Sequence, residues 1–202
     1  MKVLNLYAGI GGNRKHWNDV EVTAVEIDPL IAEVYTSAYP EDRVVVGDAH
    51  RFLQDHFSEY DFIWSSPPCP THSQYRHNVG VLGKGYPPVL PDMSLYSEIV
   101  FLRNYACALW VVENVEPYYE PLIAPSFRLQ RHFFWSNFTV PEIDFPRSEL
   151  RTKNKITDFD DYALVVNTGI PNKRQVLRNQ TEPLVGKHIM SSVKTFLKER
   201  EK

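Results

Sequence analysis

Short apolar runs alternate with helix-like stretches along the first 120 residues. Most of the apolar runs are continuous rather than alternating in polarity, which is typical of strands covered on both faces. Runs of this kind separated by helices predict an α/β fold, with a mostly parallel sheet and helices on both faces. We expect strands at residues 2–7, 22–27, 44–46, 61–65 and 109–112, and helices at residues 13–18, 29–38, 51–57 and 94–108.

The rest of the chain is less regular. Residues 70–92 are rich in glycine, proline and polar side chains, and a loop of this length is uncommon unless it is functional or disordered. These features predict a core over residues 1–140, a short basic connection over 141–182 and a C-terminal helix over 183–202 that completes the core. Within them we expect a strand at 132–138, an irregular charged connection at 141–162, a short strand at 163–167 and a helix at 183–198.

Composition indicates a soluble globular protein, with 43% hydrophobic and 23% charged residues. No apolar run approaches the roughly 20 residues of a membrane-spanning helix, and the apolar stretch at the start is too short for a signal peptide. Two cysteines, Cys69 and Cys107, do not make a disulfide framework, which favours the cytoplasm. We therefore expect a cytoplasmic protein with no membrane partner.

Charge is unevenly distributed, although the net charge is only −3. Residues 1–120 carry 8 basic against 16 acidic side chains, whereas residues 121–202 carry 14 against 9. The modestly basic C-terminal segment either faces phosphates or is an ordinary solvated surface.

Three of the expected strands end in residues typical of a nucleotide site. The first leads into residues 8–12 (AGIGG), whose glycines permit a tight turn and close approach of a ligand to the backbone. Glu26 closes the second strand 17 residues after Gly9, near the spacing at which an acid binds ribose hydroxyls, and Asp48 ends the third. Each feature alone could be a turn or a helix cap. Together they favour an adenosine-containing ligand. The turn lacks the Gly-Lys-Ser/Thr ending that would indicate a triphosphate ligand.

Cys69 lies in the stretch SSPPCPTHS, directly after the fourth strand. Pro67 and Pro68 each fix the backbone and remove an amide donor, so the thiol sits in a stiff bend suited to a nucleophile. Its polar flank argues against the alternative of a buried small hydrophobe, which fits Cys107 instead. The histidines of the same loop have no zinc-like spacing, so no metal is expected.

Glu113 leaves the fifth strand, which has the character of a buried strand. A partly desolvated carboxyl at this point could hold or deliver a proton, or it could cap the following turn. Because adjacent parallel strands end at the same edge of a sheet, Cys69 and Glu113 should reach one substrate.

In this order the segments resemble the motifs of the DNA (cytosine-5)-methyltransferase family. Residues 5–12 (NLYAGIGG) are similar to its first, cofactor-binding motif, with Tyr7 where Phe is usual. Residues 92–96 (DMSLY) occupy the place of the segment that leads into the next helix, and the resemblance covers about residues 3–138. The other matches are Glu26-Ile27-Asp28 with the second motif, Gly47-Asp48 with the third, Pro67-Pro68-Cys69 with the nucleophile motif and Glu113-Asn114-Val115 with the acid motif.

The resemblance implies a Rossmann-like class I methyltransferase that moves a methyl group from S-adenosylmethionine to C5 of cytosine in DNA. Cys69 thiolate would add to C6 while Glu113 binds the N3/N4 edge of a base flipped out of the duplex, and loop 70–92 would cover that base. The cofactor-binding residues that the resemblance implies are Tyr7, Ala8, Gly9, Ile10, Gly11, Gly12, Glu26, Ile27, Asp28, Asp48, Ala49 and Pro67.

The chain also departs from the family. Pro70 stands where Gln usually follows the cysteine, and the final motif is faint in residues 184–188 (LVGKH). The family's arginine motif has an irregular counterpart in residues 128–132 (RLQRH). Arg128 and Arg131 are therefore candidates for contacting the base or supporting the loop, or are surface charges.

Only 44 residues, 139–182, stand where DNA-acting members carry a target-recognition region. Their cations could contact phosphates but offer little to read bases, so a second subunit or a homo-oligomer could supply recognition. Restriction-modification, phage protection and regulation all fit. An amino-methyltransferase of DNA and a non-catalytic or partner-dependent subunit stay open as alternatives. The cations in question are Arg147, Arg151, Lys153, Lys155, Lys173, Arg174 and Arg178.

Overall fold

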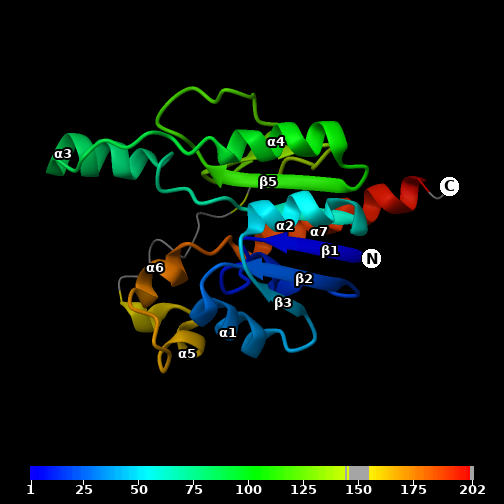
Figure 1. Cartoon of the computed structure of the whole chain (residues 1–202), viewed down its shortest axis with the longest axis horizontal. Coiled ribbons are helices and arrows are strands. Elements are labelled where there is room, and N and C mark those ends of the chain that lie inside the picture. The colour runs from blue at the N-terminus through cyan, green and yellow to red at the C-terminus, as the bar shows by residue number, and fades with distance from the viewer. Residues whose placement is uncertain (144, 146–154, 201–202) are drawn as a thin grey trace.

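The computed structural model describes residues 1–143, 145 and 155–200, and a sheet of seven strands runs through this part of the chain (Figure 1). The strand order is β3-β2-β1-β4-β5-β7-β6. The first five strands are parallel, and β7 pairs antiparallel with both β5 and β6. The strands are β1 (Lys2–Leu6), β2 (Glu21–Glu26), β3 (Arg43–Val46), β4 (Phe62–Ser65), β5 (Leu109–Val115), β6 (Phe127–Leu129) and β7 (His132–Ser136).

Helices cover both faces of the sheet, which confirms the predicted α/β architecture. On one face α7 (Pro183–Arg200) packs Ile189 and Val193 against Trp64 and Val111 of the sheet. On the other face α2 (Ala49–His56) and α4 (Ser94–Tyr105) pack against the side chains that alternate with these. Helix α1 (Pro29–Ala38) lies on the same face of the sheet as α7 and covers β2.

Local signals explain where α1 and α2 begin. The side chain of Asp28 accepts hydrogen bonds from the amides of Leu30 and Ile31, and Pro29 occupies the first helical position. The Asp48 side chain caps α2 by accepting from the amide of Arg51 at 3.0 Å. Both caps follow strand ends directly, so the carboxyl edge of the sheet is fixed by short, well-bonded turns.

The remaining helical elements are short. They are η1 (Asn13–His16), η2 (Phe57–Glu59), the π-helix η3 (Arg76–Val81), α3 (Leu82–Lys84), η5 (Ile156–Asp158), α5 (Tyr162–Val165) and α6 (Lys173–Arg178). The expected loop 70–92 therefore contains η3 and α3, and it carries α3 well away from the sheet (Figure 1). Within the described residues, no helix has the length and apolar character needed to cross a membrane.

One prediction is wrong: residues 163–167 form no strand, because α5 occupies this stretch. A short apolar run cannot be assigned to strand or helix by periodicity alone. Here a single helical turn suffices to bury Val165 against Ile10, Val34 and Leu177. Neither β6 nor α6 was expected, and each is too short to produce a periodic signal.

Candidate active site

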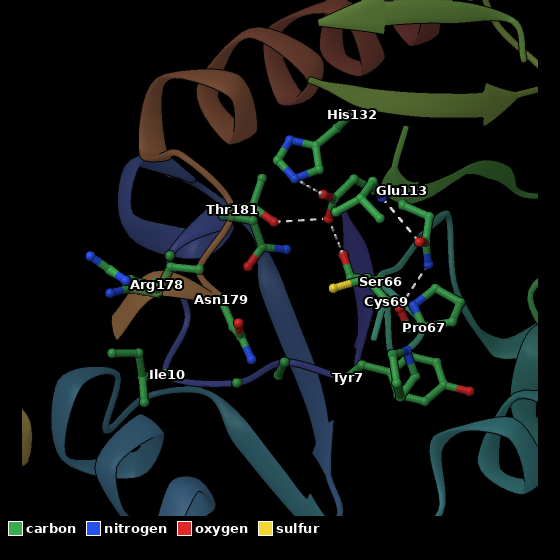
Figure 2. Close-up of a pocket in the computed structure, with 18 of the residues that line it drawn as sticks. Tyr7, Ile10, Ser66, Pro67, Cys69, Glu113, His132, Arg178, Asn179 and Thr181 are labelled. Carbon is green, nitrogen blue, oxygen red and sulfur yellow. Dashed lines mark hydrogen bonds and ion pairs between the residues drawn. The ribbon is translucent and has the colours of Figure 1, made fainter. Parts of the chain in front are cut away.

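A cavity of about 350 Å³ opens at the carboxyl edge of the parallel strands (Figure 2). The arrowheads of β1, β2 and β5 point to this side of the molecule (Figure 1). The cavity is lined by the ends of β1, β2, β4 and β5, by the turn between β6 and β7, and by residues 178–182 ahead of α7. Of the predicted residues, the lining includes Tyr7, Ala8, Gly9, Ile10, Gly12, Glu26, Ile27, Pro67, Cys69, Glu113 and Arg131.

The glycine turn after β1 is shaped so that larger residues do not fit. Gly11 has φ +82°, and a Cβ there would lie 2.3 Å from the ring of Tyr39. A Cβ on Gly12 would lie 2.6 Å from the carbonyl oxygen of Thr181. The turn is therefore packed between α1 and the segment that precedes α7.

Glu26 is hydrogen-bonded to the glycine turn at one side of the cavity. Its Oε2 accepts a hydrogen bond from the Gly9 amide at 2.9 Å, and its Oε1 accepts from the Asp28 amide at 3.0 Å. Each oxygen keeps a further lone pair for a ribose hydroxyl. Ile27 beside it is 68% exposed and offers an apolar surface to an adenine ring. This pairing of an acid with an exposed apolar side chain fits the adenosine portion of a cofactor.

Four predicted cofactor residues do not line the cavity: Gly11, Asp28, Asp48 and Ala49. The two aspartates serve as the helix caps described above, and Ala49 is the buried first residue of α2. Their direct contact with a cofactor stays a prediction.

Tyr7 is tied to a buried polar cluster beneath the cavity. It has φ +56°, which is uncommon for a residue with a side chain. Its hydroxyl donates to Glu98, which is fully buried, also accepts the Ser65 hydroxyl and contacts Nδ1 of His50. Burial raises the pKa of Tyr7, so this hydroxyl stays a donor at neutral pH. A phenylalanine at this position could not make the contact.

Cys69 and Glu113 lie on the same side of the cavity, across from Ile10 (Figure 2). Cys69 follows β4, whereas Glu113 lies within β5, which extends to Val115 instead of ending before Glu113 as expected. The two strands are neighbours in the sheet, as predicted. The side-chain amide of Asn114 donates to the Pro67 carbonyl at 2.9 Å and so joins the two strand ends. Burial, and then the negative charge of Glu113, raise the pKa of the Cys69 thiol to about 11. The resting thiol is therefore protonated near neutral pH.

The loop that starts at Cys69 is fastened to the segment after β5. Nδ1 of His72 lies 2.6 Å from the Tyr119 hydroxyl, and the Gln74 side chain donates to the Pro117 carbonyl at 3.1 Å. Among residues 70–92 only Pro70 lines the cavity. In this structure the loop therefore does not cover the site.

Glu113 is 7% exposed and contacts three side chains from different parts of the chain. Its Oε2 accepts from the Ser66 hydroxyl at 2.7 Å and from the Thr181 hydroxyl at 3.0 Å. Nε2 of His132 lies 3.5 Å from its Oε1 (Figure 2). None of these three partners was singled out from the sequence. Ser66 and His132 lie within the nucleophile and arginine motifs of the sequence, whereas no sequence pattern around Thr181 indicates a site residue.

The two candidate arginines lie in different environments. Arg128 pairs with Glu116 at 2.9 Å near the surface and does not line the cavity. Arg131 occupies the two-residue turn between β6 and β7 and does line it, and burial lowers the pKa of its guanidinium. Of the basic connection, Arg178 lines the cavity, and Lys173 donates to the Thr168 carbonyl. Arg147, Arg151 and Lys153 lie outside the described residues.

The fold defines a class I methyltransferase, a class of enzyme whose cofactor is S-adenosylmethionine. The chain belongs to the C-5 cytosine-specific DNA methylase family, whose model matches residues 1–118. The match includes both Cys69 and Glu113 and ends before β6.

Several solved methyltransferases are similar in structure. Dnmt2 methyltransferase of S. pombe is 19% identical, with 57% of this chain and 34% of that chain covered and a TM-score of 0.41. A DNMT2 triple mutant of Spodoptera frugiperda is 26% identical, with coverages of 56% and 35% and a TM-score of 0.39. The Entamoeba histolytica methyltransferase EhMeth is 17% identical, with coverages of 57% and 38% and a TM-score of 0.36. The matched part thus spans little more than a third of each of these chains. No curated protein matches the chain significantly.

Proposed function

We propose that this chain transfers a methyl group from S-adenosylmethionine to C5 of cytosine in DNA, with Cys69 as the nucleophile and Glu113 as the acid. The observation that carries the proposal is the common cavity of Cys69, Glu113 and the cofactor turn, with Asn114 bridging the two strand ends. A cofactor-binding protein without catalysis has no chemical need for a rigidly held thiol beside a buried carboxyl.

The residues suit the chemistry of this reaction. S-adenosylmethionine, when bound, supplies an electrophilic methyl group on a positively charged sulfur. Sγ of Cys69 adds to C6 of cytosine and forms a carbon–sulfur bond, while Glu113 holds the N3/N4 edge and stabilises the electron-rich ring. After C5 has gained the methyl group and lost its proton, the carbon–sulfur bond breaks and Cys69 leaves as thiolate.

The raised pKa of Cys69 links thiol activation to substrate binding. At about pH 7, a thiol with a pKa of about 11 is ionised in roughly one molecule in 10⁴. Filling the site weakens the second cause of the shift and adds a positive charge that opposes it. A base that pairs with Glu113 offsets its negative charge, and a nearby cationic sulfur favours the thiolate. The nucleophile thus becomes active only in the assembled complex.

The substrate assignment also rests on charge at the cavity. Arg131 and Arg178 both line it, and a guanidinium is well suited to bind the phosphates beside a flipped nucleotide. In this proposal residues 1–140 and residues 183–202, which include α7, form the catalytic unit, and 141–182 is a basic connection. A second subunit or a second copy would then supply sequence recognition.

Methyl transfer from labelled cofactor to cytosine-containing duplex DNA tests the proposal, with single-stranded DNA and RNA as further substrates. We expect 5-methylcytosine from the wild type and from Cys107→Ser, the control for loss of a thiol, but none from Cys69→Ser. A Cys69→Ser variant that remains fully active, or a methylated amino group as product, would favour the amino-methyltransferase alternative. Cofactor binding without any product would favour a non-catalytic subunit.

A further inference from the structure

The two oxygens of the Glu113 carboxylate lie in different surroundings. Oε2 accepts two hydroxyl hydrogen bonds, from Ser66 at 2.7 Å and from Thr181 at 3.0 Å. Oε1 has His132 Nε2 at 3.5 Å, which is beyond a good hydrogen bond. The carboxylate therefore has one oxygen engaged by the protein and one still available.

The direction of the Ser66 bond follows from its other partner. Nε1 of Trp64 donates to Oγ of Ser66 at 2.8 Å, and an indole N–H can only donate. The single hydrogen of the Ser66 hydroxyl is then left for Glu113. With Thr181 donating to the same oxygen, Oε2 is held as an acceptor, and a proton on Glu113 belongs on Oε1.

Thr181 reaches Glu113 from a distant part of the chain. It lies 68 residues beyond Glu113, outside the residues matched by the family model, and is 9% exposed. Its carbonyl oxygen packs so closely on the cofactor turn that a Cβ on Gly12 would lie 2.6 Å from it. Through this one residue the segment ahead of α7 contacts both the turn and the acid.

We propose that Ser66 and Thr181 are positioning residues that fix Glu113 with Oε1 alone presented to the base, so that Oε1 carries the proton shared with N3. This inference rests on the proposed function for the identity of the base. It extends that function by making the segment ahead of α7 part of the catalytic apparatus rather than only a support for the core.

Thr181→Val tests the proposal, because valine keeps the shape of threonine without its hydroxyl. Ser66→Ala is less clean, since it also leaves the Trp64 N–H without its partner. Thr181→Ser restores the hydroxyl. Thr168→Val is the matched control, since its hydroxyl donates to the Val165 carbonyl at 2.8 Å away from the cavity.

The first measurement is the methylation rate at saturating DNA and cofactor, together with the cofactor dissociation constant. Loss of a hydrogen bond to a charged group predicts a kcat about 10- to 100-fold lower in Thr181→Val. The cofactor dissociation constant and KM should change by less than about threefold, and Thr181→Ser should recover most of kcat. Equal kcat in Thr181→Val and wild type, or an equal loss in Thr168→Val, would overturn the proposal.

The second measurement needs no methyl transfer. It compares the carboxyl ¹³C chemical shift of Glu113, assigned by its loss in Glu113→Gln, among the variants at one pH. Because Oε2 loses one of its two hydroxyl donors, the signal should move in Thr181→Val and return in Thr181→Ser. The other titratable or charged cavity groups, all unchanged in these variants, are Tyr7 after β1, Glu26 on β2, Cys69 after β4, Arg131 and His132 at the β6–β7 turn, and Arg178 and Glu182 near Thr181.

The two measurements separate the proposals. An inactive wild type whose Glu113 signal still shifts in Thr181→Val would overturn the proposed function and leave the positioning role standing. An active wild type whose Glu113 signal is the same in Thr181→Val, Thr181→Ser and the wild type would overturn the positioning role alone.

Discussion

Replacing Glu113 with glutamine should make the Cys69 thiol more reactive, even though it removes the proposed catalytic acid. The pKa of Cys69 is raised from 9.0 to about 11, first by burial and second by the negative charge of Glu113. Glutamine keeps the shape of the side chain and removes the charge. The second cause of the shift then disappears while the first remains, so the pKa of Cys69 should fall without returning to 9.0.

The size of this change follows from the ranking of the two causes. Burial is the larger cause of the rise from 9.0 to about 11, so removing the charge of Glu113 should lower the Cys69 pKa by at most about 1, or about 1.4 kcal/mol. At any pH well below the pKa, that change raises the thiolate fraction by up to about tenfold. Because the thiolate is the reactive form, alkylation of Cys69 should accelerate by a similar factor.

The assay is the initial rate of iodoacetamide alkylation from about pH 7 to pH 10, read by peptide mass spectrometry. Cys107 is exposed, so the prediction that it is a buried small hydrophobe is wrong, and it serves as an internal reference in the same molecule. Glu116→Gln is the matched control, since this carboxylate pairs with Arg128 and does not act on Cys69. An unchanged Cys69-to-Cys107 ratio in Glu113→Gln, or the same rise in Glu116→Gln, would refute the reasoning.

Three further substitutions test the supports of the site. Gly11→Ala places a Cβ 2.3 Å from a tyrosine ring at φ +82°, so calorimetric titration should show loss of S-adenosylmethionine binding. Asn114→Ala breaks the 2.9 Å bond to the Pro67 carbonyl, and urea denaturation should show a free energy of unfolding lower by about 1–3 kcal/mol. Tyr7→Phe removes one donor from the buried Glu98, which should lower the unfolding free energy by a similar amount of about 1–3 kcal/mol while cofactor binding is retained.

The parallel half of the fold could be predicted because its signals are local. Continuous apolar runs marked the first five strands, and an aspartate followed by a proline marked the start of α1, whose observed bounds, Pro29–Ala38, are the predicted ones. Caps and buried strands depend on neighbouring residues, so the sequence carries them directly. The adjacency of β4 and β5 followed from the same pattern.

The later part of the chain could not be predicted as well, because its elements are stabilised by distant contacts. Helix α5 is a single turn whose Val165 is buried against α1 and α6, and no local pattern distinguishes it from a strand. Loop 70–92 could be predicted only in part for the same reason. Its composition indicated irregular structure but gave no indication of the π-helix within it.

The residues of the candidate site also differ in whether their signals are local or depend on distant contacts. Cys69 and Glu113 could be found because each belongs to a recognisable motif near the carboxyl end of a strand. Thr181 could not, since its contact with Glu113 spans 68 residues and depends on how the segment ahead of α7 returns to the glycine turn. His132 was inside the quoted arginine motif, but only the pairing of β7 with β5 shows that it faces Glu113 while Arg128 pairs with Glu116.

Trapping with duplex DNA that carries 5-fluorocytosine is the most direct test of the central claim, because fluorine at C5 cannot leave as a proton does. With S-adenosylmethionine present, we predict a covalent protein–DNA adduct that survives denaturation and maps by mass spectrometry to Cys69. The adduct should form in Cys107→Ser and be absent in Cys69→Ser. Methyl transfer to ordinary DNA without any such adduct, or an adduct that maps elsewhere, would contradict the assignment of Cys69 as the nucleophile.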